Sequence, residues 1–394
     1  MNALPPLVQQ HFDLIATDSL LTPEELEFRG VVRQFVADEI RPNVAGWFAD
    51  AIFPTDIVPK LGALGLLGAH LKGYGCPGRS AIEYGLAAME IEAGDSGIRT
   101  FVSVQGSLAM SALHKWGSEE QKQAWLPPMA AGEVIGCFGL TEPTAGSDPS
   151  SMQTFATKTD DGGWSLSGSK RWIGLASIAD IAIIWANTED GIRGFLVPTE
   201  TEGFSAVPIE PKLSMRASIQ CDITMTDVRL PASALLPGTR GIRSAFECLN
   251  EARYGIIWGA MGAARDSFEA AVAYSKERLQ FGKPLAAYQL TQQKFANMLI
   301  EIEKGTLLAI HLGRLKDRGE LTPQQISLGK LNAVREAIAI CREARTVFGG
   351  NGITLDYSPF RHANNLESVR TYEGTDEVHT LVLGQAITGE SAFH

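Results

Sequence analysis

The stretch Thr371-Tyr372-Glu373-Gly374-Thr375-Asp376-Glu377-Val378-His379, near the C-terminus, is the most informative part of this chain. It follows Ser368-Val369-Arg370, which we expect to be extended. Tyr372 can shield the Glu373 carboxylate from water and make it a better proton acceptor, and a carbonyl group could approach the N–H of Gly374 closely. This combination suits removal of a proton next to a carbonyl. Taken alone, Tyr-Glu-Gly-Thr is most often a polar turn.

Composition limits the classes of protein to consider. The 394 residues are 45% hydrophobic, enough to bury a large core, and we expect two or three domains. The net charge of −11 and the pI near 5.2 argue against a nucleic-acid surface or an anionic membrane surface. An acidic protein can still carry a local basic pocket for an anionic substrate.

Targeting, membrane and metal signals are weak. The segment Met1-Asn2-Ala3-Leu4-Pro5-Pro6 lacks a basic region followed by an apolar run, so we expect no secretory signal and a cytoplasmic location. No apolar run approaches the roughly 20 residues of a membrane helix. The five cysteines are widely separated and read as buried thiols, and no histidine lies in a metal-ligand spacing. We therefore predict no metal site.

The order of secondary structure is unusual. Residues 1–136 read as helical, 137–240 as a β-rich middle domain, and 241–394 as a bundle of four long helices. Helix starts are marked by the capping boxes at Thr22, Ser118 and Thr322. Residues 219–226 alternate between apolar and polar, as in a half-buried strand. The fold class is therefore α+β and multidomain.

Three glycine-rich or basic tracts have simple structural explanations. Gly73-Tyr74-Gly75-Cys76-Pro77-Gly78 satisfies G-x-G-x-x-G, but it lacks a preceding strand, so we predict a loop and no dinucleotide site. Gly349-Gly350-Asn351-Gly352 follows a predicted helix and suits a C-cap, although its bare backbone would also let a cofactor approach. Arg278 closes another helix, where a cation is favourable without any ligand; its spacing to Gln289 makes phosphate binding an alternative.

Taken together, these tracts resemble the acyl-CoA dehydrogenase family. Thr-Glu-Pro-x-x-Gly-Ser-Asp at 141–148, Trp172-Ile173, Arg278-x-x-Phe281-Gly282, Gly349–Gly352 and Tyr372–Thr375 occur in that family's order and spacing, over about residues 21–393. Within the family the chain is most similar to the glutaryl-CoA dehydrogenases, on tracts such as Asp148-Pro149-Ser150-Ser151-Met152 and Leu312-Gly313-Arg314-Leu315-Lys316-Asp317.

This resemblance implies an architecture and a chemistry. It implies an N-terminal helical domain, a β-barrel-like middle domain and a C-terminal four-helix bundle, assembled as a homotetramer. It also implies bound FAD, glutaryl-CoA as the acyl-CoA substrate, and electron-transfer flavoprotein as the electron acceptor. Oxidation with loss of CO2 would give crotonyl-CoA.

The family's site residues carry over by position. Glu373 would be the catalytic base and the Gly374 N–H would bind the thioester carbonyl. Other substrate-binding positions would be Glu92, Arg99, Thr100, Ser147, Phe246, Asn250, Arg253 and Tyr372. FAD would be bound by Phe138, Leu140, Thr141, Gly146, Ser147, Trp172, Ile173, Gly174, Arg278, Phe281, Gln289, Thr346, Val347, Phe348, Gly349, Gly350, Thr375, Asp376, Glu377 and Phe393.

Arg99 is the position that distinguishes substrates. In glutaryl-CoA dehydrogenases the matching arginine pairs with the distal carboxylate of the acyl chain, and a guanidinium offers a bidentate, permanently charged fork for that purpose. The simpler interpretation is a surface arginine on a helix, or one that merely pairs with Glu92.

Departures from the family pattern keep other functions open. Gly174 stands where threonine is usual, Asp376-Glu377 replaces His-Asp, and Thr346 replaces an acidic residue. A monocarboxylic short-chain acyl-CoA dehydrogenase would share everything except a purpose for Arg99. An acyl-CoA oxidase would pass electrons to dioxygen, with Gly174 as its support. A CoA-binding protein without catalysis would leave Glu373 idle.

Overall fold

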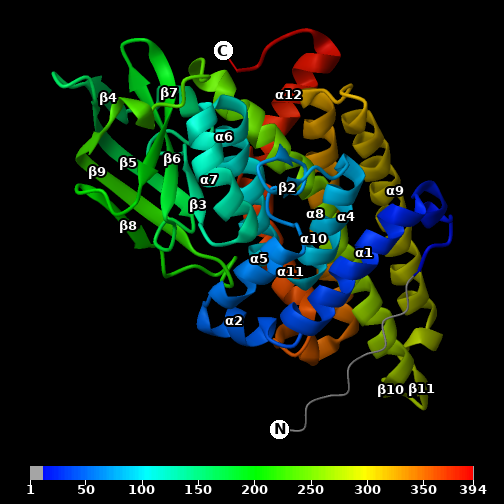
Figure 1. Ribbon diagram of the computed structural model, residues 1–394. Coiled ribbons are helices and arrows are strands. Elements are labelled where there is room, and N and C mark those ends of the chain that lie inside the picture. The colour runs from blue at the N-terminus through cyan, green and yellow to red at the C-terminus, as the bar shows by residue number, and fades with distance from the viewer. Residues whose placement is uncertain (1–11, 394) are drawn as a thin grey trace. The chain divides into compact units, whose positions relative to one another are not determined.

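The computed structural model describes residues 12–393 (Figure 1). The chain divides into two compact units. The first, called the helical unit below, contains residues up to Ala49, Ala81–Ser96 and residues from Tyr254 onward. The second, called the sheet unit, contains Asp50–Ser80 and Gly97–Arg253. Three helices, α2 (Val44–Asp50), α5 (Ser96–Ser103) and α8 (Gly241–Glu277), contribute residues to both.

The predicted helix starts of the helical unit are confirmed. The Thr22 capping box opens α1, and the Thr322 box opens α10, with proline in the first turn of each. Thr375 accepts a hydrogen bond from the Val378 N–H and caps α12. The main helices outside α2 and α8 are α1 (Pro23–Phe35), α4 (Ala81–Gly94), α9 (Gln289–Asp317), α10 (Pro323–Val347), α11 (Ser358–Thr371) and α12 (Asp376–Thr388).

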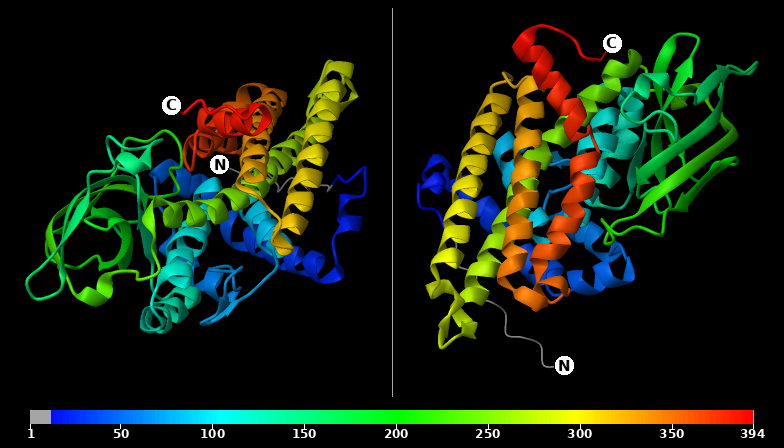
Figure 2. Two further views of the ribbon diagram at one scale, coloured as in Figure 1. Left: turned by 90° about the horizontal axis from the view of Figure 1, so that it is seen from above. Right: turned by 180° about the vertical axis from the view of Figure 1, so that it is seen from behind.

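Helix α10 is central to the arrangement that positions the candidate site. It packs against α9, α11 and α12, and these helices run side by side in the right-hand view of Figure 2. Its buried residues recur at helical spacing, among them Ile326, Lys330, Val334 and Ala337. A lysine therefore lies on the apolar stripe that faces the neighbouring helices.

One prediction in this region is wrong. Ser368-Val369-Arg370, expected to be extended, forms the last turns of α11, and this helix was not predicted. The β-branched Val369 favours a strand locally, but it is buried on a helix whose other buried residues include Leu366 and Ala363. Tertiary packing has overridden a short local propensity.

The sheet unit is built around a seven-stranded sheet within the described residues, in the order β3-β6-β4-β5-β9-β8, with β7 paired to β6. Most pairings are antiparallel, but β3 and β4 each pair with β6 in parallel. The predicted alternation lies in β9. The strands are β3 (Gly136–Gly139), β4 (Phe155–Lys158), β5 (Trp164–Gly174), β6 (Ile181–Thr188), β7 (Gly191–Pro198), β8 (Phe204–Pro208) and β9 (Gln220–Leu230).

The sheet buries an apolar cluster that includes Leu166, Ile184, Phe195 and Ile223. Helices complete this unit: α3 (Val58–Ala63), α5 (Ser96–Ser103), the π-helical segment Val104–Met110, α6 (Ser111–Trp116) and α7 (Glu119–Ala131). The Ser118 capping box at the start of α7 is confirmed. Gly73 and Cys76 belong to a small hairpin of β1 (Lys72–Gly73) and β2 (Cys76–Pro77), as expected for a loop and not for a nucleotide fingerprint.

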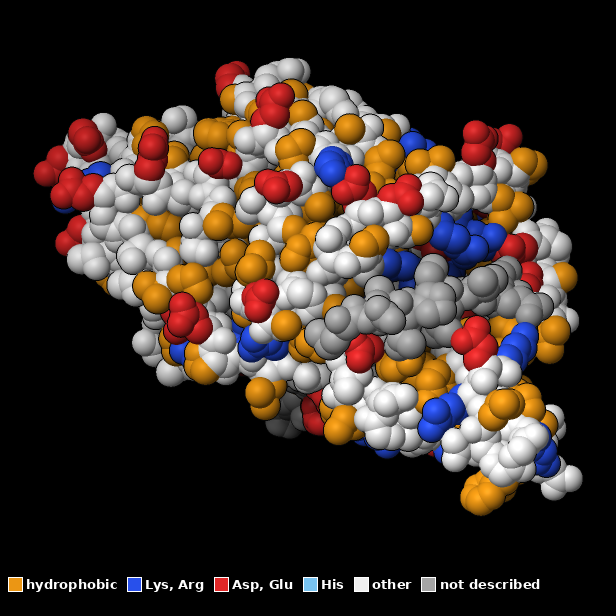
Figure 3. Space-filling model, turned by 90° about the horizontal axis from the view of Figure 1, so that it is seen from below, with side chains coloured by type: hydrophobic (Ala, Val, Ile, Leu, Met, Phe, Trp, Pro, Cys, Tyr) orange, Lys and Arg blue, Asp and Glu red, His pale blue; other side chains and the backbone are white. Residues whose placement is uncertain are grey.

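The predicted order of helices, then sheet, then helices is confirmed, whereas the domain boundaries at 136/137 and 240/241 stay a prediction. Of the five cysteines, Cys137, Cys221, Cys248 and Cys341 are buried, and Cys76 is half-buried. Across residues 12–393, no helix is both long enough and apolar enough to cross a membrane. Acidic side chains are scattered over the face shown in Figure 3, among apolar groups and a few basic ones.

Candidate active site

In the helical unit, the candidate base lies on a four-residue turn between α11 and α12. Glu373 adopts a left-handed backbone conformation with φ of +55°, and Gly374 has φ of +96°. A left-handed conformation is uncommon for a residue with a side chain and is found most often at functional sites. The Oε2 atom of Glu373 is buried.

The carbonyl oxygens of this turn are held by side chains from α10 and α12. The Lys330 ammonium donates hydrogen bonds to the carbonyls of Tyr372 and Gly374, the latter at 2.6 Å. The Glu373 carbonyl lies 3.3 Å from Nε2 of His379, whose Nδ1 lies 3.0 Å from the Ser327 hydroxyl. Lys330 and His379 are both buried.

Gly374 is required by this packing as well as by its backbone conformation. A Cβ added there would lie 2.7 Å from Nε2 of His379. The sequence predicts that this glycine lets a substrate carbonyl approach closely. The packing of His379 against it is a second reason, and that reason is purely structural.

Asp376 and Glu377, expected near a cofactor, have different surroundings. The Asp376 carboxylate is buried and accepts hydrogen bonds from Arg335 Nε at 3.0 Å and Arg370 Nε at 2.8 Å. It thus ties α10 and α11 to the start of α12, where a negative charge is favourable. Glu377 is exposed in the same first turn.

Most of the residues expected to bind a dinucleotide in this unit are exposed. Phe281 lies at the tip of the hairpin of β10 (Leu279–Gln280) and β11 (Lys283–Pro284) and is 96% exposed. Gln289 is the first residue of α9, and Thr346 accepts a hydrogen bond from Lys294 Nζ at 2.8 Å. The remaining positions are Arg278, Val347, Phe348, Gly349, Gly350 and Phe393, of which Val347 and Phe348 are buried.

Two glycines in the candidate site leave their backbone open. A Cβ added at Gly350 in the helical unit, or at Gly146 in the sheet unit, would meet no atom within 4 Å. Neither residue has a positive φ, so neither a clash nor backbone conformation explains the glycine. Gly349, by contrast, has φ of +58° and follows the C-cap of α10, as predicted.

In the sheet unit, the loop after β3 is fixed by a buried ion pair. The Lys170 ammonium contacts Glu142 Oε1 at 2.8 Å and the Leu140 carbonyl at 3.1 Å. Glu142 also accepts the N–H groups of Gln153 at 2.6 Å and Thr154 at 2.9 Å. The candidate residues Phe138, Leu140 and Thr141 precede this anchor, and Gly146 and Ser147 follow it in exposed positions.

Burial and hydrogen bonding act differently on the two members of this pair. Burial lowers the pKa of Lys170 to about 8, although its contact with Glu142 acts in the opposite direction. Burial would raise the pKa of Glu142, but the hydrogen bonds from Gln153, Lys170 and Thr154 outweigh it and hold that pKa below its ordinary value. At neutral pH both groups are charged.

Strand β5 presents three further candidate residues at its end. Trp172 has φ of +64° and is 52% exposed, at an irregularity in the pairing of β5 with β9 between Lys170 and Ile173. Ile173 is buried. A Cβ added at Gly174 would lie 3.3 Å from Cγ2 of Val104, which belongs to the π-helical segment after α5, and would meet no other side chain within 4 Å.

The candidate substrate residues lie on helices. Arg99, on α5, is 1% exposed and Thr100 is half-buried. Phe246, Asn250 and Arg253 are spaced on one face of α8, where Arg253 donates to the Asn250 side chain at 3.1 Å. Glu92 is buried on α4, in the helical unit.

Family models match almost the whole chain. The N-terminal, middle and C-terminal domains of acyl-CoA dehydrogenase match residues 22–133, 137–228 and 239–388. The chain belongs to the acyl-CoA dehydrogenase family.

Within the acyl-CoA dehydrogenase family, the relatives differ in their substrates. A glutaryl-CoA dehydrogenase from Mycobacterium smegmatis, solved in complex with FADH2, is 58% identical, with a TM-score of 0.96 over 97% of this chain and 98% of that one. Butyryl-CoA dehydrogenase from Megasphaera elsdenii is 32% identical, with a TM-score of 0.89 over 96% and 100%. The human mitochondrial short-chain specific acyl-CoA dehydrogenase is 35% identical over 89% of this chain and 87% of its own length.

Sequence reasoning missed the buried groups that hold the loop after β3 and the turn between α11 and α12. Lys170 and Lys330 were not proposed as site residues, because their partners lie 28 or more residues away in the chain. His379 was not proposed because its contact with the Glu373 carbonyl depends on a turn whose conformation is set by distant residues. One signal was present. Lys330 falls on the apolar stripe of a predicted helix, at four-residue spacing from Ile326 and Val334.

Proposed function

We propose that this protein is an FAD-dependent enzyme that oxidises glutaryl-CoA and releases CO2, giving crotonyl-CoA. The observation that carries the choice of substrate is the burial of Arg99, which is 1% exposed on α5. Burial argues against a surface arginine. A buried guanidinium is costly unless acceptors surround it, and its planar fork matches the distal carboxylate of a glutaryl chain.

The residues present fit FAD. Gly146 and Gly350 leave their backbone open without any need in the chain's own packing, as is useful where a ligand approaches the main chain. Trp172 and Phe281 expose large aromatic surfaces that a flat ring system can cover. When bound, FAD would supply the acceptor for the substrate's β-hydride.

The turn on which Glu373 lies supplies the proton chemistry. Glu373 would remove the α-proton of the acyl chain, and the Gly374 N–H would stabilise the negative charge that develops on the thioester oxygen. The unsaturated product can then lose its carboxylate as CO2, because the electron pair of the broken C–C bond delocalises into the thioester. Protonation of that carbanion gives crotonyl-CoA.

Glu373 has a direct test. Glu373→Gln should keep FAD and bind acyl-CoA, yet bleach the flavin about 10²–10⁴-fold more slowly on mixing with glutaryl-CoA, since general-base removal typically has this effect. Anaerobic stopped-flow absorbance measures the rate, and mass spectrometry identifies crotonyl-CoA and CO2 from the wild type. Bleaching at the wild-type rate would eliminate this assignment.

A short-chain enzyme for monocarboxylic substrates is the second candidate, because the relatives at 32–35% identity include enzymes of that kind. Arg99→Met separates the two. Losing a charge-assisted bidentate contact costs roughly 1.5–3 kcal/mol, about a 10- to 100-fold fall in kcat/KM for glutaryl-CoA, whereas butyryl-CoA should react as well or better. An equal loss on both substrates would mean that Arg99 supports only the fold.

Electron-transfer flavoprotein is the proposed electron acceptor. Gly174 favours an oxidase, but Val104 lies close to the position of its missing side chain and takes up part of the space that dioxygen would use. Substrate-reduced enzyme should therefore reoxidise slowly in air and rapidly with electron-transfer flavoprotein. Rapid formation of hydrogen peroxide from glutaryl-CoA would instead promote the oxidase.

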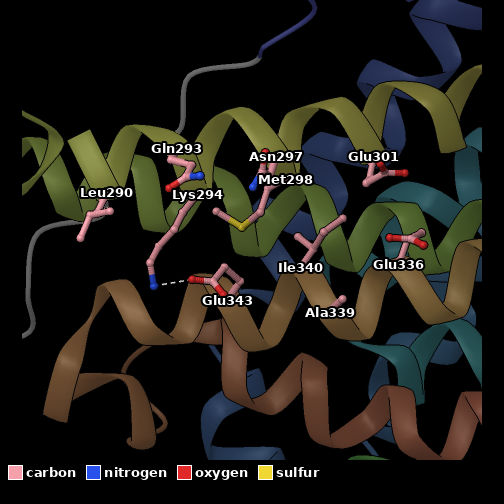
Figure 4. Close-up of a pocket in the computed structure, with 10 residues that line it drawn as sticks. All are labelled: Leu290, Gln293, Lys294, Asn297, Met298, Glu301, Glu336, Ala339, Ile340 and Glu343. Atoms are coloured by element: carbon pink, nitrogen blue, oxygen red, sulfur yellow. Dashed lines mark ion pairs between the residues drawn. The ribbon is translucent and has the colours of Figure 1, made fainter. Parts of the chain in front are cut away.

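Assembly as a homotetramer also remains a proposal, as does the cytoplasmic location. Its support is apolar surface on the helical unit: Ile300 and Leu307, seven residues apart on α9, are exposed. A groove of about 520 Å³ lies between α9 and α10. Its lining, shown in Figure 4, combines the apolar Leu290, Met298, Ala339 and Ile340 with six polar or charged side chains, among them the Lys294–Glu343 ion pair. Light scattering of the FAD-loaded protein measures the number of subunits.

A further inference from the structure

We propose that Lys330 is a positioning residue that holds the base Glu373 in its left-handed conformation. The inference rests on the proposed function, because it concerns how the same turn is kept ready for proton removal. Lys330 lies on α10, is 2% exposed, and donates hydrogen bonds to the carbonyls on either side of Glu373. One ammonium therefore joins the residue before the base to the residue after it.

Holding both carbonyls determines the backbone conformation between them. The carbonyls of Tyr372 and Gly374 can reach a single Nζ only if the chain turns sharply at Glu373, as its φ of +55° records. Such a conformation is unfavourable for a residue with a side chain and persists only where the surroundings enforce it. Hydrogen bonds from a charged donor are about twice as strong as neutral ones.

The third carbonyl of the turn completes the arrangement. Glu373 O lies 3.3 Å from Nε2 of His379, on α12. A neutral imidazole satisfies both of its contacts if Nε2–H donates to this carbonyl and Nδ1 accepts from the Ser327 hydroxyl, which is 3.0 Å away. Ser327 and Lys330 are three residues apart on α10, so one helix face controls all three carbonyls.

The hydrogen bonds from Lys330 affect function by orienting two groups of the turn. Fixing the backbone at 372–374 fixes where the Glu373 carboxylate and the Gly374 N–H point. Both act on the same acyl thioester, and a displacement of about 1 Å at a reacting group can cost roughly 10²-fold in rate. Lys330 thus acts through Glu373 and Gly374 and not by contact with the substrate.

The test compares Lys330→Met with Lys304→Met, a control on α9 whose exposed ammonium bonds only to nearby Glu301 among the contacts described. The probe is an acyl-CoA with sulfur in place of the β-carbon, which can lose its α-proton but cannot give up a β-hydride. Its enolate gives a long-wavelength charge-transfer band with oxidised flavin, so the band reports proton removal and the shift of the main flavin absorbance reports binding.

We expect Lys330→Met to keep its FAD and to bind the probe within about 3-fold of the wild type. The charge-transfer band should weaken strongly, and flavin bleaching by glutaryl-CoA should slow about 10²-fold, with KM little changed. Lys304→Met should match the wild type in every measurement. A wild-type band and bleaching rate in Lys330→Met would overturn the inference.

A second variant covers the case in which Lys330→Met does not fold. Ser327→Ala removes only the hydroxyl that orients His379, and it should slow bleaching several-fold while FAD content is unchanged. If Lys330→Met loses FAD and Ser327→Ala behaves as wild type, Lys330 supports only the fold and the inference fails. Failure of the proposed function is recognised separately, because Glu373→Gln would then bleach at the wild-type rate whatever Lys330→Met does.

Discussion

Two lysines, one in each compact unit, are buried beside a loop of the candidate site, and their surroundings differ. In the sheet unit, Lys170 pairs with the Glu142 carboxylate and also binds the Leu140 carbonyl. In the helical unit, Lys330 binds the two backbone carbonyls that flank Glu373. The first lysine anchors a loop by neutralising a charge, and the second shapes a turn by joining main-chain groups.

This difference predicts which measurement each lysine controls. Removing one member of a buried ion pair leaves the other charge buried, so the effect falls on stability. Removing a donor from two carbonyls allows the turn to relax, and the effect then falls on the rate of the proton step. The comparison therefore assigns Lys170 to the fold and Lys330 to positioning.

The largest expected effect on stability is that of Lys170→Met. It would leave the Glu142 carboxylate buried without its ammonium, at a cost of about 3–5 kcal/mol in the free energy of unfolding. Urea titration measures this, with Lys330→Met in parallel and expected to lose less. The double variant Lys170→Met/Glu142→Gln should recover much of the loss, because neither charge of this ion pair then remains buried. Equal losses in the two single variants would break the comparison.

The sequence predicts more of the fold than of these anchors. Capping boxes at Thr22, Ser118 and Thr322 are local patterns, and each begins a helix as expected. By contrast, Val369 was assigned to an extended segment although it lies on α11, because its burial depends on α10, which is distant in sequence. Local chemistry marks helix ends well and long-range packing poorly.

The candidate site shows the same division. The family motifs locate Glu373 and Arg99, but neither motif contains Lys330, which lies 43 or 231 residues away from them in the chain. Which buried cation meets which carbonyl is settled only when α10 and α12 pack together. The apolar stripe of α10 could have marked Lys330 as unusual, without indicating its partner.

The dependence of stability on pH sharpens the assignment of Lys170. Its pKa of about 8 in the folded state lies below its ordinary value of 10.5, so the unfolded chain binds more protons between these values and stability should rise with pH there. The pKa of Glu142 is held below its ordinary value of 4.5, so its contribution is present above that value and is lost as the pH falls through the folded pKa. In Lys170→Met/Glu142→Gln, stability should depend less on pH in both ranges. Urea titration at several pH values measures this. A pH profile of stability unchanged from the wild type would contradict the roles given to Lys170 and Glu142.

The smallest expected effect concerns Gly174, four residues after Lys170 on β5. A threonine there would place its Cβ 3.3 Å from Cγ2 of Val104, and overpacking of this kind typically costs about 1–3 kcal/mol. Gly174→Thr should therefore lower the free energy of unfolding by less than Lys170→Met does, and Gly174→Thr/Val104→Ala should regain part of it because the smaller side chain makes room.

Reoxidation by air tests the same two positions in a different way, with the single variants Gly174→Thr and Val104→Ala. If Val104 already fills the space beside Gly174, the wild type and Gly174→Thr should reoxidise at similar slow rates, whereas Val104→Ala alone should react faster with dioxygen. Stopped-flow absorbance after reduction by glutaryl-CoA measures all three. A large fall in the rate in Gly174→Thr would show instead that the glycine itself admits dioxygen, and it would favour an oxidase over a dehydrogenase.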